Sequence, residues 1–174
     1  MTGAVSLDAG LCLIRPWQHS DHASLVRHAN NRKVWLTLRD QFPHPYTSAD
    51  GEEWLVYCAK QRLVTNFAIV VDGEAAGGIG VAPQPDVHRR SAEVGYWLGE
   101  AVWNRGIMTA ALRTFTTYAF DAYDLIRLFA GVFSSNPASM RVLEKAGYVR
   151  EGTLRRSVVK DGQILDQVLY AVTR

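Results

Sequence analysis

The sequence predicts a mixed α/β fold in which about four helices flank one sheet of about seven strands. Segments whose apolar residues recur at helical spacing are interspersed with segments of strand-like composition, and no repeat or low-complexity segment interrupts them. The chain has 174 residues, 48% of them apolar and 21% charged, which is enough for one domain with a sizeable core. We therefore expect residues 1–174 to form a single domain without an internal linker.

The N-terminal third is predicted to contain one strand followed by helices. Leu11–Pro16 has a strand-like composition and stops at its proline. Ser20–His22 can cap a first helix, and Val34–Leu38 continues as a second helical piece. The stretch Arg39–Tyr46 cannot be regular, because its two prolines are only two residues apart. Thr47–Ser48 can then cap a third helix.

The middle of the chain changes to a strand pattern. Phe67–Val71 and Ala75–Val81 flank the dipeptide Asp72–Gly73, which indicates a β-hairpin with a tight turn. Ser91–Leu98 is predicted as the next strand, after a proline-rich loop. A helix is expected from Gly106 to about Asp121. The apolar residues that recur at helical spacing in it are Ile107, Ala111, Phe115 and Ala119.

The last third contains a short helix with signals at both ends. Asn136 suits its N-cap, Pro137 suits its first position, and Gly147 suits the left-handed residue after its end. Three more strands are expected, at Ile126–Phe133, Arg150–Lys160 and Ile164–Val172, with Asp161–Gly162 as the turn between the last two.

Two segments about thirty residues apart carry the strongest functional signal. Trp103–Thr109 is a glycine-bearing turn that opens a helix, an arrangement that binds phosphate oxygens on free backbone N–H groups. Asn136–Tyr148 is the short helix described above. Together they resemble the acetyl-CoA-binding core of the GNAT superfamily of N-acetyltransferases, above all its RimJ/RimL branch. The resemblance covers nearly the whole chain and implies the GNAT fold, a mostly antiparallel mixed sheet splayed between strands 4 and 5.

The resemblance also implies how acetyl-CoA is bound as co-substrate. Trp97, Leu98 and Gly99 would line the pantetheine arm, and Asn136 would begin the helix beside the thioester. The residues expected to bind the pyrophosphate are Arg105, Gly106, Ile107, Met108 and Thr109. Only Gly106 keeps the six-residue pattern common in the family, and Asn104 replaces a glycine, which leaves the loop conformation open. A plain strand-to-helix loop is the alternative.

Gly95 lies inside the strand that is expected to splay. A glycine at such a position indicates a bulge or the close approach of another backbone. The alternative is that it makes room for a neighbouring aromatic side chain.

Amide formation from a thioester needs a base for the amine and a proton for the departing sulfur. Glu93 and Glu151 are the candidate bases; each could instead be an ordinary surface carboxylate. Glu151 ranks slightly ahead, because Glu151–Arg155 resembles the RimL-like segment that carries a catalytic glutamate. Many relatives carry a tyrosine as the acid where this chain has Leu143, so the resemblance implies that Ser139 takes that role. Alternatively, Ser139 has only a structural role and completes the first turn of its helix. A backbone N–H near Trp97 would polarise the acetyl carbonyl.

The acceptor is expected to be a primary amine that attacks directly in a ternary complex. The branch resemblance favours the α-amine of a protein or peptide N-terminus. A polyamine, aminoglycoside or amino-acid-like amine is one alternative, and a non-catalytic acyl-CoA-binding sensor or interaction module is another. Acceptor specificity is expected in the first helices, the Arg39–Tyr46 loop and the Asp161–Gly162 hairpin. Aromatic residues that could wall a slot there, or else belong to the core, are Trp35, Phe42, His44, Tyr46 and Trp54.

Other partners and compartments are disfavoured by composition. A net charge of +2 is too small to indicate nucleic acid or an anionic membrane, and no run of eighteen apolar residues occurs. Met1–Gly10 lacks the pattern of a signal peptide, so a cytoplasmic protein is expected. Cys12 and Cys58 suit reduced, buried thiols, and the five histidines form no metal-binding motif. A homodimer remains open.

Overall fold

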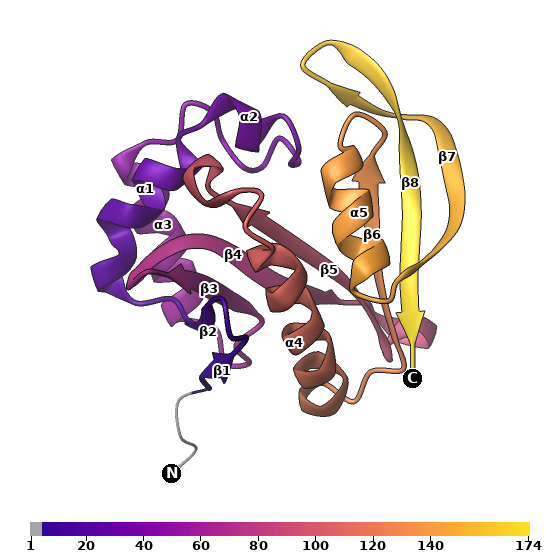
Figure 1. The fold of residues 1–174 in the computed structure, drawn as a ribbon, viewed down its shortest axis with the longest axis horizontal. Coiled ribbons are helices and arrows are strands. Elements are labelled where there is room, and N and C mark those ends of the chain that lie inside the picture. The colour runs from indigo at the N-terminus through magenta and orange to yellow at the C-terminus, as the bar shows by residue number, and fades with distance from the viewer. Residues whose placement is uncertain (1–4) are drawn as a thin grey trace.

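A computed structural model describes residues 5–174; residues 1–4, the start of the Met1–Gly10 segment, lie outside this range. Within this range, eight strands form one sheet in the order β1-β2-β3-β4-β5-β6-β8-β7 (Figure 1). The strands are β1 Leu7–Asp8, β2 Leu13–Pro16, β3 Asn66–Val71, β4 Glu74–Pro83, β5 Ser91–Leu98, β6 Arg127–Phe133, β7 Val149–Lys160 and β8 Gln163–Thr173. Neighbouring strands are antiparallel except β5 and β6, which confirms the predicted mixed, mostly antiparallel sheet. The count is eight because Leu7–Asp8 adds a short strand beside β2, which the sequence prediction missed.

Residues 5–174 contain five α-helices. They are α1 His22–Ala29, α2 Arg32–Trp35, α3 Ser48–Ala59, α4 Ile107–Ala122 and α5 Pro137–Lys145. Three 3₁₀ turns lie at His19–Asp21, Asp86–His88 and Glu100–Val102. Helices α4 and α5 lie together against one face (Figure 1), whereas α1 and α3 pack against the other.

The two faces have separate cores because consecutive strand residues point to opposite sides of a sheet. In β3, Phe67 and Ile69 belong to the core under α4, and Ala68 between them belongs to the core under α1 and α3. Phe115 of α4 is fully buried, and its ring meets that of Phe67 edge to face with centroids 5.5 Å apart. Cys12 and Cys58 are buried free thiols, as predicted.

Strands β5 and β6 separate after a short shared stretch. Ser91–Glu93 pairs with Arg127–Phe129 in parallel, and no register continues beyond these residues. β5 nevertheless stays paired with β4 as far as Leu98, and β6 stays paired with β8 as far as Phe133. The predicted splay is therefore present. It falls between β5 and β6 because β1 shifts the numbering by one.

Helix α3 begins with a reciprocal cap. The backbone N–H of Asp50 donates to Thr47 Oγ1 over 3.3 Å, and the backbone N–H of Thr47 donates to Asp50 Oδ2 over 2.7 Å. We expect Thr47→Ala to lower the free energy of unfolding by about 1 kcal/mol, because a helix donor loses its acceptor. Urea unfolding measures this. Thr117→Ala removes an exposed hydroxyl that bonds only to its own helix, and should change stability by less than about 0.5 kcal/mol.

Candidate active site

The splay leaves one edge of β5 without a strand partner. The segment Val94–Leu98 pairs with β4 and has no register with β6. Gly95 pairs with Gly80 without a register shift, and a Cβ placed on Gly95 would meet no atom within 4 Å. Gly95 therefore forms no bulge and makes no room for an aromatic ring. The sequence allows three interpretations of Gly95: a bulge, room for an aromatic side chain, and close approach of another backbone. The geometry is compatible with the third.

The turn before α4 leaves the first N–H groups of the helix without a side-chain cap. Gly106 is the N-cap with φ +76°, and no side chain caps the first turn. The N–H groups at the start of an α-helix have no partner within the helix, so those of Ile107, Met108 and Thr109 are available to an anion. Asn104 also adopts a left-handed conformation, with φ 59°, which asparagine tolerates better than most residues. The replacement of a glycine at position 104 is thereby accommodated.

Several residues that are predicted to bind the cofactor form hydrogen bonds with other groups of the protein. Arg105 Nη1 donates to Asp72 Oδ2 over 3.1 Å. The carbonyl of Leu98 accepts a 2.6 Å hydrogen bond from Trp103 Nε1, and the N–H of Gly99 donates to the carbonyl of Ala76 over 2.7 Å. These bonds hold the end of β5 in place, while the edge of β5 from Val94 onward has no strand partner on the side of β6.

The start of α5 brings Asn136 and Ser139 to the splay. Asn136 Oδ1 accepts the backbone N–H of Ser139 over 3.2 Å, which confirms the predicted N-cap. Ser139 Oγ lies 2.8 Å from the phenol oxygen of Tyr96 in β5. Leu143, where many relatives carry a tyrosine, is fully buried in the core.

Tyr96 is the residue at this site that the sequence analysis missed. Its neighbour Trp97 packs on the opposite face of β5, in the core under α1 and α3. Tyr96 itself packs against the core under α4 and α5. The alternation of strand residues, combined with the predicted splay, could have placed Tyr96 toward the Asn136 helix.

Glu93 lies where the splay begins. It is the last residue of β5 that pairs with β6, opposite Phe129. Its side chain is 21% exposed and forms an ion pair with Arg39, from the irregular loop after α2. Consecutive side chains of β5 point to opposite faces of the sheet, and Glu93 is three positions before Tyr96. The side chain of Glu93 therefore lies on the face opposite Tyr96 and Ser139.

Glu151 lies elsewhere, on the edge strand β7. Both of its carboxylate oxygens pair with Arg127, the first residue of β6, and its side chain is 39% exposed. The hydrogen bonds from Arg127 lower the pKa of Glu151 below its ordinary value. The two candidate bases are thus held by different arginines and do not form a pair.

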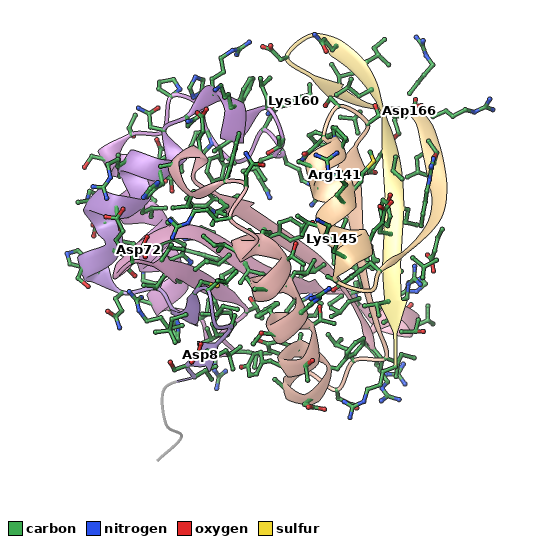
Figure 2. The ribbon with its side chains drawn as sticks, in the orientation of Figure 1. Asp8, Asp72, Arg141, Lys145, Lys160 and Asp166 are labelled. Atoms are coloured by element: carbon green, nitrogen blue, oxygen red, sulfur yellow. The ribbon has the colours of Figure 1, made fainter. Side chains whose placement is uncertain are left out.

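The predicted acceptor segments meet in space, although they are far apart in sequence. Lys160 lies at the end of β7 (Figure 2) and is 3% exposed. Its Nζ lies 2.7 Å from Asp40 Oδ1. The same Nζ lies 3.6 Å from the centroid of the Trp35 ring. Arg32 Nη2 lies 2.6 Å from Asp161 Oδ2. We call this junction the latch: it joins Lys160 and Asp161, at the tip of the β7–β8 hairpin, to Arg32 and Trp35 of α2 and Asp40 of the following loop.

A cavity of about 540 Å³ lies beside the latch. Its lining residues are Trp35, Asp40, Pro43, His44, Val159, Asp161 and Gly162. Trp35 and His44 stack on each other with centroids 5.6 Å apart. The other aromatic residues proposed for a slot have core positions: Tyr46 is buried, and Phe42 and Trp54 pack against the core under α1 and α3.

Within residues 5–174, no helix is long and apolar enough to cross a membrane. The same part of the chain contains no group of three or more histidine, cysteine, aspartate or glutamate side chains that could hold a metal ion.

The splayed mixed sheet, with a glycine-capped helix after β5 and an asparagine-capped helix after β6, defines the GNAT fold. The chain belongs to the acetyltransferase (GNAT) domain family, whose model matches residues 12–149.

Curated relatives and solved structures agree with this assignment. Over 83 residues the chain is 43% identical to "Probable N-acetyltransferase YjcK" of Bacillus subtilis, covering 48% of this chain and 46% of that protein. It spans about half the length of the Bacillus subtilis relatives that it matches in this way. A longer match, 28% identical over 90% of this chain and 81% of the other, is to the "[Ribosomal protein uS5]-alanine N-acetyltransferase" of Escherichia coli. Among solved structures, Mycobacterium smegmatis RimJ in complex with CoA-disulfide has a TM-score of 0.82 and 28% identity, covering 98% of this chain and 86% of that one.

Proposed function

We propose that residues 1–174 form one N-acetyltransferase domain that transfers an acetyl group from acetyl-CoA to the α-amine of a protein or peptide N-terminus. The observation that carries this proposal is the arrangement around the splay. A carboxylate, Glu93, lies on one face of β5, and a hydroxyl pair, Ser139 and Tyr96, lies on the other. A thioester in the splay would therefore have a base on one side and a proton donor on the other.

The residues at the splay fit acetyl-CoA. The unpaired edge of β5 and the open space at Gly95 suit a peptide-like pantetheine arm, which needs backbone partners at close range. The first turn of α4 offers free N–H groups to a pyrophosphate, and Arg105 lies next to its N-cap. The Mycobacterium smegmatis structure with CoA-disulfide supports the same ligand class.

Acetyl-CoA supplies an acetyl thioester whose carbonyl carbon accepts the amine nitrogen and whose sulfur departs. Glu93 accepts, directly or through water, the proton that the α-ammonium loses to become the attacking amine. Backbone N–H groups of β5 near Trp97 polarise the carbonyl oxygen. Ser139 donates a proton to the sulfur as the C–S bond breaks. The nitrogen thus loses one proton to Glu93 before attack and a second to water as the C–N bond forms. The sulfur gains one, and exchange with water restores both side chains, so that one proton is released overall.

Glu93 is the better candidate for the base, although the resemblance of Glu151–Arg155 to the RimL-like segment favours Glu151. Glu93 adjoins the splay, and its partner Arg39 belongs to the loop that leads to the latch, so the carboxylate lies on the side where an acceptor would arrive. Arg127 occupies both oxygens of Glu151 and lowers its pKa, which weakens it as a base.

An α-amine suits this site better than a lysine side chain. Its pKa is about 8, whereas that of a lysine is about 10.4, so a carboxylate base can deprotonate the α-amine more readily near neutral pH. The Escherichia coli relative, which is named for acetylating an alanine of a ribosomal protein, supports the same class of acceptor.

The proposal is tested by release of free thiol from acetyl-CoA with a panel of acceptors. We expect turnover with peptides that begin with a small residue such as alanine. Turnover only with polyamines or aminoglycosides would indicate that the site acetylates small-molecule amines and not protein N-termini. Binding of acetyl-CoA without turnover for any acceptor would indicate a sensor or interaction module.

The latch is proposed to form one wall of the acceptor site. We expect Lys160→Ala to raise the KM for a peptide acceptor about 2- to 30-fold, because the hairpin loses its contact with the Trp35 ring. The KM for acetyl-CoA should stay unchanged. Steady-state kinetics measure both constants. Lys60→Ala, an exposed lysine at the end of α3, is the control, and equal acceptor KM values in the two variants would remove the latch from the acceptor site.

A further inference from the structure

The hydroxyl groups of Tyr96 and Ser139 join the two sides of the splay. Tyr96 comes from β5, and Ser139 comes from the first turn of α5, which follows β6. Their oxygens are 2.8 Å apart, a normal hydrogen bond between hydroxyls. Either oxygen could be the donor on distance alone, so the surroundings must decide the direction.

The surroundings indicate that the phenol donates. If Ser139 donated to Tyr96, the phenol hydrogen would need another acceptor. Apart from Ser139 Oγ, the acceptor that the phenol reaches in the described part of the chain is the carbonyl of Ser139, at 3.5 Å. This distance lies beyond the range of an effective O–H···O hydrogen bond, whereas donation by the phenol to Oγ makes a good bond at 2.8 Å. Burial also raises the pKa of the Tyr96 phenol, so it keeps its proton.

Donation by Tyr96 fixes where the serine hydrogen can point. A hydroxyl has one hydrogen and two acceptor lone pairs, and the phenol occupies one lone pair of Ser139 Oγ. The hydrogen of Ser139 is then left to bond with another group. The backbone N–H of Ser139 is already bound by Asn136, so the position of the residue is fixed as well.

We propose that Tyr96 is a positioning residue that orients the hydroxyl of Ser139 toward the sulfur of CoA. This inference rests on the proposed function, in which Ser139 donates the proton to the departing sulfur. Tyr96 keeps its own proton throughout; the proton that reaches the sulfur comes from Ser139, which recovers one from water. A buried tyrosinate is not formed at any step.

The test uses a readout that needs no turnover, the pKa of the thiol of CoA bound to the protein, followed by ultraviolet absorbance of the thiolate. A hydrogen bond donated to the sulfur stabilises the thiolate and lowers this pKa. We expect Tyr96→Phe to raise it by about 0.5 to 1, the size expected for one lost hydrogen bond. Ser139→Ala should raise it at least as much, and Tyr96→Phe should add nothing in the Ser139→Ala background.

Kinetics provide the second readout. We expect Tyr96→Phe to lower kcat about 3- to 10-fold while the KM for acetyl-CoA stays within about twofold, because only the orientation of a donor is lost. Ser139→Ala should lower kcat about 10- to 100-fold, since the donor itself is removed.

Tyr148→Phe is the matched control. Tyr148 is also a buried tyrosine, and its hydroxyl lies 2.8 Å from Thr116 Oγ1 in α4, so the variant removes the same type of bond at the same distance. It should lower the melting temperature without changing kcat or the pKa of bound CoA.

Wild-type values of kcat and thiol pKa in Tyr96→Phe would overturn the inference, as would equal effects of Tyr96→Phe and Tyr148→Phe. Should Tyr96→Phe not fold, Ser139→Thr, which keeps the hydroxyl, should retain the low thiol pKa that Ser139→Ala loses. Equal values in those two variants would also overturn it. Absence of turnover in a wild-type protein that shows the expected thiol pKa values would instead refute the proposed function alone.

Discussion

Glu93→Gln is expected to lower kcat/KM for a peptide acceptor by about 10²- to 10⁴-fold near neutral pH, the range typical of a lost general base. The amide keeps the size of the side chain but cannot accept the proton of the amine. The deficit should shrink above pH 8, because an α-amine with a pKa near 8 then reaches the site without its extra proton. Affinity for acetyl-CoA should not change. The measurement is kcat/KM from pH 6 to pH 10.

Glu151→Gln is the comparison that assigns the base. It removes the ion pair with Arg127 but, by our account, no catalytic group, so its kcat/KM should stay within a few-fold of wild type. A large loss in Glu151→Gln with a normal Glu93→Gln would reverse the assignment. Normal kinetics in both variants would remove the two glutamates from the mechanism.

Arg105→Glu is expected to weaken binding of CoA by about 10- to 150-fold, the equivalent of a lost charge-assisted hydrogen bond of about 1.5 to 3 kcal/mol. The substitution also places a carboxylate beside the N-terminus of α4, where the pyrophosphate is proposed to bind, so repulsion adds to the lost contact. Calorimetric titration with CoA measures the effect.

Asp72→Asn tests whether the loss of CoA affinity in Arg105→Glu comes only from breaking the ion pair between Arg105 and Asp72. Asp72 holds Arg105 over 3.1 Å, and its neutralisation should leave CoA affinity equal to wild type or higher. If Arg105→Glu bound CoA as tightly as wild type, the assignment of the turn before α4 to the pyrophosphate would be wrong.

Most of the fold could be predicted because its signals are local. The Asp-Gly turns, the proline-broken loop and the caps of α3 and α5 each specify backbone geometry within a few residues. β1 could not be predicted in this way, since Leu7–Asp8 is too short for a periodic pattern and is a strand only because β2 lies beside it.

The site was less predictable because its contacts join distant segments. The sequence indicated Ser139 and both glutamates, and it grouped the Arg39–Tyr46 loop with the Asp161–Gly162 turn. The sequence could not show that Arg127 would form an ion pair with Glu151, or that the hydroxyl groups of Tyr96 and Ser139 would form a hydrogen bond across the splay. These pairings depend on how β5 and β6 diverge, which no local pattern specifies. Phe42, Tyr46 and Trp54 were similarly ambiguous, because an aromatic residue can form a core as well as a wall.

The most direct test of the account is mass spectrometry of a peptide that contains both a free N-terminal alanine and one lysine, incubated with the protein and acetyl-CoA. We predict a gain of one acetyl group located on the α-amine, and its loss with Glu93→Gln near neutral pH. Acetylation of the lysine instead, or of neither amine while acetyl-CoA is bound, would contradict the proposal that this chain acetylates N-termini.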